Sequence, residues 1–531
     1  MSIKKAVRAL HGSLVALMFL GTWSHREGLA QTTFHVNGSC GDDSWSGLSP
    51  KCQAPDGPKR TIQAAMNLAQ GGDVVLVADG IYTGSGNKWL FFPDQEFTLR
   101  SASGPEGCVI DLQRSGVAFF LVADEGPLAV IEGFTVKNGS GSSGGAAFLH
   151  HDADATFVNC VFTGNSSSRG GAIYAETTAS ATFIDCVIRG NTALYGGGVC
   201  LSDASDPTFL NCDISANVAS IDGGGVFVQT FGTTPRLVNC TVTGNSAGGA
   251  GGGIFVAAGP ATITNCTIAD NVAAGRGGGF ACQGPSTPTI TNCILWDDGA
   301  PIGSEIALLD DPNLGGTTLT LRFSDFEGGA AAVLVDPGST LNLGAGNLDV
   351  DPRFVDSAAS NYQLSPSSPC IDAGNNADVP AEAANDPLGT PRILDGDSDG
   401  NAVVDMGAFE RFFCQQDLGF GGPGDSVLSV CGEELLSGNN AELRLANALP
   451  LHQVFLIAGL SSNPTAFGGG VLVPIPILLL FPLATGGDGE LSFNVSGGHG
   501  PLTIYLQFVY QDPQLPGGFG ISNALAVQLL P

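Results

Sequence analysis

The stretch "TITNCTIADNVAAGRGGGF", residues 262–280, decides the fold, because close copies of it come earlier in the chain. They read "RLVNCTVTGNSAGGAGGGIF" (236–255), "TFLNCDISANVASIDGGGVF" (208–227) and "TFIDCVIRGNTALYGGGVC" (182–200). Each copy has an Asn-Cys or Asp-Cys step, then an asparagine, then a glycine cluster. A repeat of this length indicates a stack of similar structural units.

The cysteines measure the period of this repeat. They are Cys160, Cys186, Cys212, Cys240, Cys266 and Cys293, separated by 26, 26, 28, 26 and 27 residues. Two further steps of 26 backwards reach Phe134 and Cys108. The register therefore predicts eight coils.

Each coil consists of short β-branched segments separated by Asn, Gly and Ser, which favours strands over helices. Ile263 and Cys266 are three residues apart, so in one continuous strand their side chains would point to opposite faces. This spacing predicts a bend between two strands. Three short strands and three turns in about 26 residues are typical of a right-handed parallel β-helix. We expect the asparagines five residues after each cysteine, such as Asn165 and Asn191, to bond along the stack in left-handed turns. For the cysteine column we favour a buried thiol ladder over disulfides.

Two short motifs also resemble those of a known family. "FTGN" (162–165) and "GGAI" (170–173) are similar to the repeats of polymorphic outer-membrane proteins, within the pectate-lyase-like right-handed β-helix superfamily. Farther on, "LDVDPRFVD", "YQLSPSSPCIDAG" and "VVDMGAFE" (348–410) resemble the closing segment of secreted choice-of-anchor proteins. The resemblance implies export and surface display or secretion, and it implies no reaction.

The sequence predicts an all-β chain in five segments. Residues 1–30 read as a signal peptide, because a basic start and the apolar run "SLVALMFLGTW" precede a small-residue site. We expect an N-terminal loop and cap helix at 31–72 and the single-stranded β-helix solenoid at 73–330. The closing segment is expected at 331–412 and a small antiparallel β-sandwich at 413–531. Removing residues 1–30 would leave no membrane span.

Charge limits the classes of partner. The whole chain has a formal net charge of −30, and no lysine follows Lys137. Such a surface disfavours nucleic acid and anionic lipid. The expected partner is a polysaccharide or a cell-surface glycan, and we expect a monomer.

Four cysteines are disulfide candidates in an exported chain. Cys40 and Cys52 flank a polar loop, and Cys414 and Cys431 bracket a glycine-rich linker.

A calcium site is expected in "DGDSDGNAVVD" (395–405). Asp395, Asp397 and Asp399 follow the D-x-D-x-D-G spacing whose oxygen ligands can wrap a calcium ion. Met406 stands at the twelfth position, so only Asp405 could supply the final carboxylate. The alternative is a polar turn, and a bound ion would be structural.

Catalysis would need acids on one outer sheet. His150, His151, Asp152 and Asp154 occur in "HHDADA", and Asp206 lies two periods after Asp154. Carboxylates two coils apart would approach the spacing of an inverting glycosidase. Arg169 lies before a glycine cluster and reads as a solvated turn residue.

Two functions therefore stand. The first is an exported, non-catalytic surface or secreted protein for adhesion or glycan contact. The alternative is a carbohydrate-active enzyme, a polysaccharide lyase or glycoside hydrolase, acting in the β-helix groove with Asp154 and Asp206.

Overall fold

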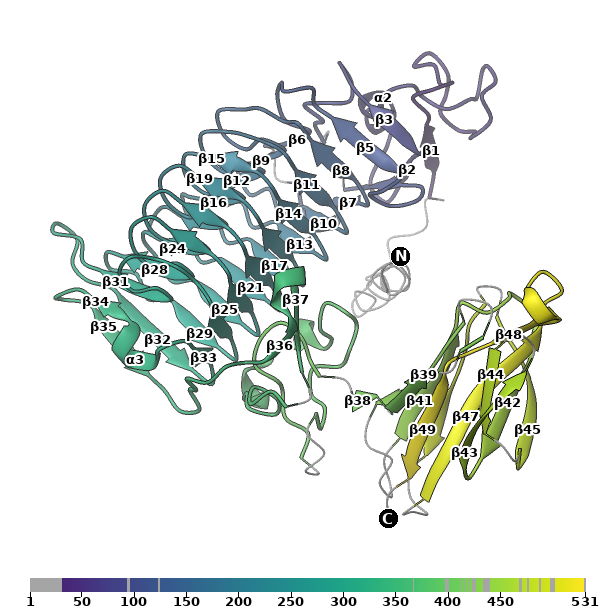
Figure 1. Ribbon diagram of the computed structural model, residues 1–531. Coiled ribbons are helices and arrows are strands. Elements are labelled where there is room, and N and C mark those ends of the chain that lie inside the picture. The colour runs from purple at the N-terminus through teal and green to yellow at the C-terminus, as the bar shows by residue number, and fades with distance from the viewer. Residues whose placement is uncertain are drawn as a thin grey trace. The chain divides into compact units, whose positions relative to one another are not determined.

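The computed structural model describes residues 31–531, apart from 93–95, 123–124, 366, 397–400, 412, 415, 420, 423–425, 433–439, 468–469, 475–476, 487–488, 497–501 and 530–531. The expected signal peptide lies outside the described residues. The chain divides into two units (Figure 1). The first comprises residues 1–393 and 403–410, and the second 394–402 and 411–531. No helix of the described residues is long and apolar enough to cross a membrane.

The first unit is a right-handed parallel β-helix, as the repeat predicts (Figure 1). Three long parallel sheets run along it, and successive coils add successive strands to each; a short fourth sheet has four strands. Sheet A contains β1 (Thr33–Val36), β2 (Val74–Val77), β4 (Thr98–Ser101), β7 (Val130–Glu132), β10 (Thr156–Val158), β13 (Thr182–Ile184), β17 (Thr208–Leu210), β21 (Arg236–Val238), β25 (Thr262–Thr264), β29 (Thr289–Thr291), β32 (Thr318–Arg322) and β35 (Thr340–Leu343). Parallel pairing thus extends beyond the expected 73–330 at both ends.

The other sheets complete each coil. Sheet B contains β3 (Gly80–Tyr82), β5 (Cys108–Asp111), β8 (Thr135–Lys137), β11 (Val161–Thr163), β14 (Val187–Arg189), β18 (Asp213–Ser215), β22 (Thr241–Thr243), β26 (Thr267–Ala269), β30 (Ile294–Trp296) and β33 (Asp325–Phe326). Sheet C contains β6 (Phe119–Leu121), β9 (Ala147–Leu149), β12 (Ile173–Ala175), β16 (Val199–Leu201), β20 (Val226–Val228), β24 (Ile254–Val256), β28 (Phe280–Gln283), β31 (Ile306–Leu309) and β34 (Leu334–Val335). Sheet D contains β15 (Thr192–Ala193), β19 (Val218–Ala219), β23 (Ser246–Ala247) and β27 (Val272–Ala273).

The ends of the solenoid carry two short helices. Helix α2 (Ile62–Met66) lies in the segment expected to contain the cap helix and buries Ile62, Ala65 and Met66. The Thr61 side chain does not cap this helix and donates a hydrogen bond to Asp43 instead. Helix α3 (Gly329–Ala332) follows β33.

The interior follows the predicted register. Val161 pairs with Val187, so each cysteine of the repeat lies one coil from the next. The repeat cysteines Cys160 to Cys293 are buried free thiols. Stacked phenylalanines accompany them, with ring centroids 4.8 Å apart for Phe157 and Phe183. Identical residues therefore form continuous columns inside the solenoid.

The left-handed turn lies elsewhere than expected. Positive φ occurs at the residue before each repeat cysteine from Cys160 to Cys293, for example Asn239 (53°) and Asn265 (52°), which makes the bend between sheets A and B. The expectation that the column of Asn165 is left-handed is wrong. The preceding residue, Gly164 with φ 64°, takes that conformation instead.

The buried asparagines do bond along the axis. In this Asn ladder, each side-chain amide donates to the oxygen of the next, for example Asn191 Nδ2 to Asn217 Oδ1 at 2.9 Å. The same oxygen accepts from the backbone N–H of Asn191 at 3.0 Å. The members are Asn165, Asn191, Asn217, Asn245 and Asn271. The ladder thus saturates buried polar groups at one corner of five coils.

The ladder ends on two buried carboxyl groups. Asp298 Oδ1 accepts from the N–H and Nδ2 of Asn271, at 2.7 and 2.9 Å. Glu305 Oε1 accepts from the backbone N–H of Asp298 at 3.0 Å. The remaining oxygens of both acids, Oδ2 and Oε2, are buried and receive no hydrogen bond from any other described residue. Burial, and then the charge of Asp298, raises the pKa of Glu305. Glu305 therefore carries a proton in the folded protein at neutral pH.

We expect this pair to make the solenoid less stable as pH rises. The pKa of Glu305 is higher in the folded than in the unfolded protein. Its contribution to stability is therefore complete below the unfolded carboxyl pKa and is lost as pH rises through the folded pKa. Each unit of pKa shift corresponds to about 1.4 kcal/mol. Glu305→Gln removes the titration and should reduce the loss of stability between about pH 5 and about pH 9. Urea unfolding followed by tryptophan fluorescence measures this, since no tryptophan follows Trp296. An unchanged pH dependence in this variant would contradict the assignment, and the exposed Glu106→Gln is the control.

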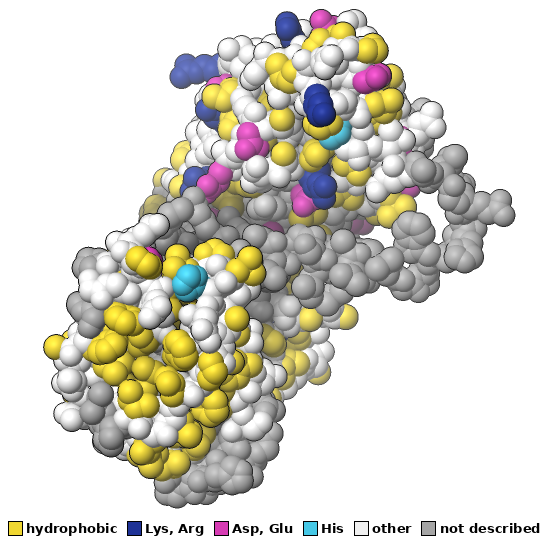
Figure 2. Space-filling model, turned by 90° about the vertical axis from the view of Figure 1, so that its right-hand side faces the viewer, with side chains coloured by type: hydrophobic (Ala, Val, Ile, Leu, Met, Phe, Trp, Pro, Cys, Tyr) yellow, Lys and Arg dark blue, Asp and Glu magenta, His cyan; other side chains and the backbone are white. Residues whose placement is uncertain are grey.

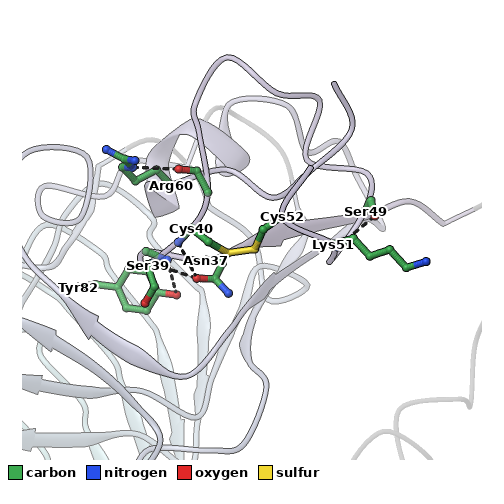
Figure 3. The surroundings of a disulfide bond; sticks show 10 residues. Asn37, Ser39, Cys40, Ser49, Lys51, Cys52, Arg60 and Tyr82 are labelled. Carbon is green, nitrogen blue, oxygen red and sulfur yellow. Dashed lines mark hydrogen bonds between the residues drawn. A yellow bond between two sulfur atoms is a disulfide. The ribbon is translucent and has the colours of Figure 1, made fainter. Parts of the chain in front are cut away.

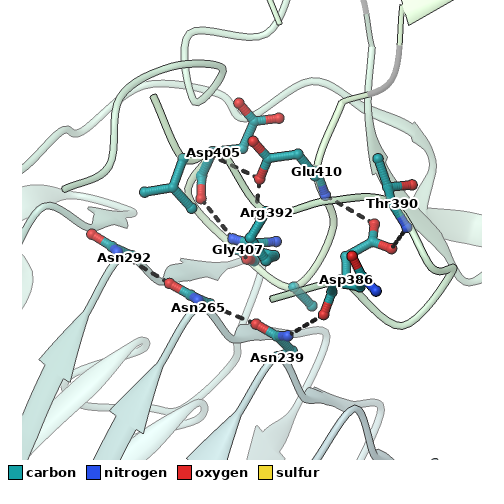
Figure 4. A network of polar contacts seen from close by, with 12 residues as sticks. Asn239, Asn265, Asn292, Asp386, Thr390, Arg392, Asp405, Gly407 and Glu410 are labelled. Atoms are coloured by element: carbon teal, nitrogen blue, oxygen red, sulfur yellow. Dashed lines mark hydrogen bonds and ion pairs between the residues drawn. The ribbon is translucent and has the colours of Figure 1, made fainter. Parts of the chain in front are cut away.

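The segment after β35 folds back against the side of the solenoid. It contains the hairpin of β36 (Phe354–Asp356) and β37 (Asn361–Leu364) and 3₁₀ turns at Ser357–Ala359, Asn376–Asp378 and Ala381–Ala383. Asn375 N–H donates to Asn292 Oδ1 at 2.9 Å, and Asn239 Nδ2 donates to Asn385 O at 2.8 Å. The closing segment therefore covers the corner between sheets A and B over these coils (Figure 4).

The second unit consists of antiparallel sheets, as the alternating sequence predicts. One sheet has the order β38 (Phe413–Cys414), β40 (Val427–Gly432), β41 (Asn440–Ala446) and β46 (Leu491–Ser496). The other has the order β39 (Gln416–Gly419), β49 (Ala524–Leu529), β47 (Leu502–Gln511), β42 (Gln453–Gly459) and β45 (Leu479–Ala484), with β48 (Phe519–Ile521) paired to β47. A hairpin of β43 (Ser462–Phe467) and β44 (Gly470–Pro474) and a 3₁₀ turn at Pro516–Gly518 complete the unit. A core that includes Leu443, Leu456 and Phe508 lies between the sheets.

Candidate functional site

The acids expected to be catalytic take part in turns. Asp154 Oδ1 accepts from the backbone N–H of Ser180 at 3.1 Å, and burial raises the pKa of Asp154. Asp206 Oδ1 accepts from the backbone N–H of Thr234 at 2.7 Å. Each carboxylate therefore holds the turn of the next coil. Their pairing in catalysis stays a prediction.

The expected calcium loop is described only in part. Asp397 and Asp399 lie outside the described residues. Asp405 is fully buried, and its Oδ1 accepts from the backbone N–H of Asp372 at 2.8 Å. No group of three or more His, Cys, Asp or Glu side chains within the described ranges is arranged to hold a metal ion. Calcium binding by Asp395 and its neighbours stays a prediction.

The structure describes one of the two expected disulfide pairs in full and the other only at the backbone. A disulfide joins Cys40 to Cys52, with Cα atoms 5.8 Å apart, beside an Asn37 side chain that accepts from the N–H groups of Ser39 and Cys40 (Figure 3). Cys414 and Cys431 are opposite each other on β38 and β40. Their side chains lie outside the described residues, so that pairing stays a prediction.

A row of aromatic residues that the sequence reasoning missed follows the outer face of sheet C. The middle residue of each strand points away from the core, and neighbouring rings stack along the solenoid axis. Ring centroids lie 5.5 Å apart for Phe120 and Phe148 and 6.0 Å apart for Phe148 and Tyr174. Phe227 and Phe255 continue the row with a separation of 5.5 Å. In the sequence, this row could have been found from aromatic residues spaced 26 to 28 residues apart, although Cys200 interrupts the series.

Only the N-terminal part of this row is accessible. Phe227 and Phe255 are buried, and Phe227 lies against Tyr195 from the preceding coil's glycine-rich connection. Phe120 and Phe148 are partly exposed. Trp89 is half exposed and packs edge-on against Phe120, with centroids 5.5 Å apart. We call Trp89, Phe120 and Phe148 the aromatic patch.

Polar side chains adjoin the aromatic patch. The His150 ring stacks on Phe148 with a centroid separation of 5.8 Å, and its Nε2 lies 3.8 Å from Glu176 Oε1. The Tyr174 hydroxyl donates to Glu176 Oε2 at 2.8 Å. Burial, and also the Glu176 carboxylate, raises the pKa of Tyr174 to about 12, so this hydroxyl keeps its proton. The patch therefore ends in a polar group that can both donate and accept hydrogen bonds.

Arg169 belongs to the same group. Its guanidinium is exposed but interacts with the Tyr174 hydroxyl, which raises the pKa of Arg169. The sequence interpretation of Arg169 as only a solvated turn residue is therefore incomplete. We call His150, Arg169, Tyr174 and Glu176 the polar cluster.

A hollow of about 480 Å³ lies at the corner between sheets A and B. Its lining includes Arg100, Glu132, Asn159 and Asp185 and contains no aromatic residue. Sugar-binding and other small-molecule sites usually combine apolar or aromatic walls with a few polar groups. The aromatic patch with its polar cluster is therefore the better candidate site.

Comparison with known proteins adds a family match over part of the chain. Residues 115–296 match the family model of a right-handed β-helix region. This region includes the polar cluster and most of the aromatic row. No curated protein matches the chain.

Solved structures with similarity to the chain have low sequence identity. A complex of XylC with xylose has 10% identity and a TM-score of 0.36, covering 61% of this chain and 87% of that one. The tailspike protein of Acinetobacter phage vB_ApiP_P1 has 13% identity and a TM-score of 0.25, covering 88% and 81%. The enzymatically active domain of tailspike protein 4 of bacteriophage CBA120 has 13% identity and a TM-score of 0.28, covering 88% and 65%. At these TM-scores the similarities carry no argument about function.

Proposed function

We propose that this protein is an exported β-helix protein that binds a polysaccharide or cell-surface glycan at the aromatic patch. The observation that carries the proposal is the continuous row of Trp89, Phe120 and Phe148 rings, spaced 5.5 Å apart and ending at the polar cluster. Sugar rings expose apolar C–H faces that pack on aromatic rings, and their hydroxyls need donors and acceptors nearby. The net charge of −30 favours a neutral glycan over an acidic one.

Trp89→Ala is expected to weaken glycan binding about tenfold or more, because the variant removes the most exposed ring of the patch. The mature chain would be tested by retention on immobilised neutral and acidic polysaccharides, followed by titration with the retained one. Ile81→Ala is the control, since Ile81 is an exposed apolar residue of sheet B. Equal affinities of the two variants, or no retention on any glycan, would refute the proposed site.

The second candidate function is a carbohydrate-active enzyme, and the polar cluster favours it. His150, Tyr174 and Glu176 combine a carboxylate, an imidazole and a hydroxyl, groups that act as general acids and bases. Incubation with the retained polysaccharide would then release new reducing ends or unsaturated uronates. Glu176→Gln should abolish the products while leaving retention in place. Retention without products supports binding alone.

A further inference from the structure

Strand β45 (Leu479–Ala484) of the second unit has an unusual apolar exposure. It is the last strand of its sheet and pairs only with β42 among the described strands. Leu479 and Leu480 are each 54% exposed, and Phe481 is 48% exposed. Ile477 and Leu478, just before the strand, are also exposed. Figure 2 shows apolar side chains gathered on a face of this unit.

The strand carries no charged residue of the kind that normally protects such an edge, although one proline lies within it. Soluble proteins place charged side chains, especially lysine, on edge strands to prevent pairing with another chain. Here no charged residue occurs between Arg444 and Asp488. Pro482 interrupts only the second half of the strand. The edge thus keeps backbone groups and apolar side chains that can accept another strand.

An apolar hollow lies next to the same edge. Its volume is about 210 Å³, and its lining includes Ile457 of β42, Phe467 of β43 and Leu480 of β45. None of its lining residues carries a charge. A hollow of this size accommodates apolar side chains from a partner surface. The edge and the hollow therefore form one continuous surface that requires an apolar, extended partner.

We propose that β45 pairs antiparallel with β45 of a second copy of this chain. Such a pairing is self-complementary, as a two-fold dimer requires. It also brings the run Ile477–Phe481 of each copy towards the hollow of the other. A strand satisfies the backbone N–H and C=O groups of the edge, whereas lipid chains would leave them unpaired. This proposal replaces the expectation of a monomer.

The test is the oligomeric state of the full mature chain by sedimentation velocity over a range of concentrations. We expect a reversible dimer, and Leu480→Asp should weaken dimerisation at least tenfold by placing two charges at the pairing edge. Leu479→Lys is a second variant with the opposite charge. Both positions are half exposed, and far-UV circular dichroism would verify the fold of each variant.

Leu451→Asp is the matched control. Leu451 is 79% exposed, lies outside the strand, and has φ 52°, which aspartate tolerates. A control that dimerises like the wild type, together with monomeric β45 variants, supports the proposal. A monomer at every concentration, or a dimer that both β45 variants retain, overturns it. A wild-type monomer that floats with neutral phosphatidylcholine vesicles would assign the face to a membrane instead.

Discussion

Replacing Asn217 by alanine is expected to destabilise the solenoid by at least about 3 kcal/mol, since it leaves three buried polar groups unsatisfied and each costs about 1–3 kcal/mol. Asn217 is fully buried. Its Nδ2 donates to Ile188 O at 2.8 Å and to Asn245 Oδ1 at 3.0 Å. Its Oδ1 accepts from the backbone N–H and Nδ2 of Asn191. The alanine variant therefore leaves one carbonyl and two donors without these partners inside a buried corner.

Urea unfolding monitored by tryptophan fluorescence measures this loss in the first unit alone, because no tryptophan follows Trp296. The matched control is Val218→Ala at the next residue, where the side chain is 45% exposed. That variant should change the free energy of unfolding by less than about 0.5 kcal/mol. Similar losses in the two variants would show that the ladder contributes little beyond local packing.

The Asn ladder also shows why much of this fold could be predicted from the sequence. In a solenoid, residues one period apart become neighbours in space, so a sequence spacing of 26 translates directly into a contact. The register of the cysteine and asparagine columns follows from this rule. The rule does not say which residue of a turn has positive φ. The left-handed position was therefore assigned to Asn165 instead of Gly164.

The candidate site was harder to predict than the fold. The outward aromatic column contains Phe148 and Tyr174 but is interrupted by Cys200, so it stands out less than the cysteine column. The polar cluster depends on side-chain directions across two coils. The exposure of β45 depends on which strand ends the sheet, and an alternating pattern does not fix strand order. These features need the three-dimensional arrangement.

The contacts of the closing segment likewise could not be predicted from the repeat period, because they join residues far apart in sequence. Asn239 and Asn385, for example, are 146 residues apart and hydrogen-bonded. The segment is held by a buried arginine, Arg392, which is 1% exposed (Figure 4). Its Nη2 donates to the carbonyl oxygens of Asp405 and Gly407, at 2.9 and 3.0 Å.

Arg392→Met is expected to destabilise the packing of the closing segment by about 3–5 kcal/mol, the usual loss when one partner of a buried ion pair is removed. Arg392 Nε lies 3.6 Å from Glu410 Oε2, and both side chains are 1% exposed. The charge of Arg392 also counteracts the effect of burial, which raises the pKa of Asp386. Methionine fills a similar volume but removes the positive charge of Arg392 from beside these two buried carboxyl groups. Hydrogen exchange at residues 375–392 would report the loosened segment.

The matched control for this variant is Arg322→Met. Arg322 joins the solenoid to the closing segment through a 2.6 Å contact with Asp378, but it is 44% exposed. Exposed pairs contribute at most about 1 kcal/mol, so this variant should leave hydrogen exchange nearly unchanged. The Arg392 variant should also recover protection as the pH is lowered, because burial raises the pKa of Asp386 and protonation removes its charge. Equal exchange in the two variants, or an Arg392 defect that does not depend on pH, would mean that Arg392 acts through its volume and its carbonyl contacts rather than through its charge.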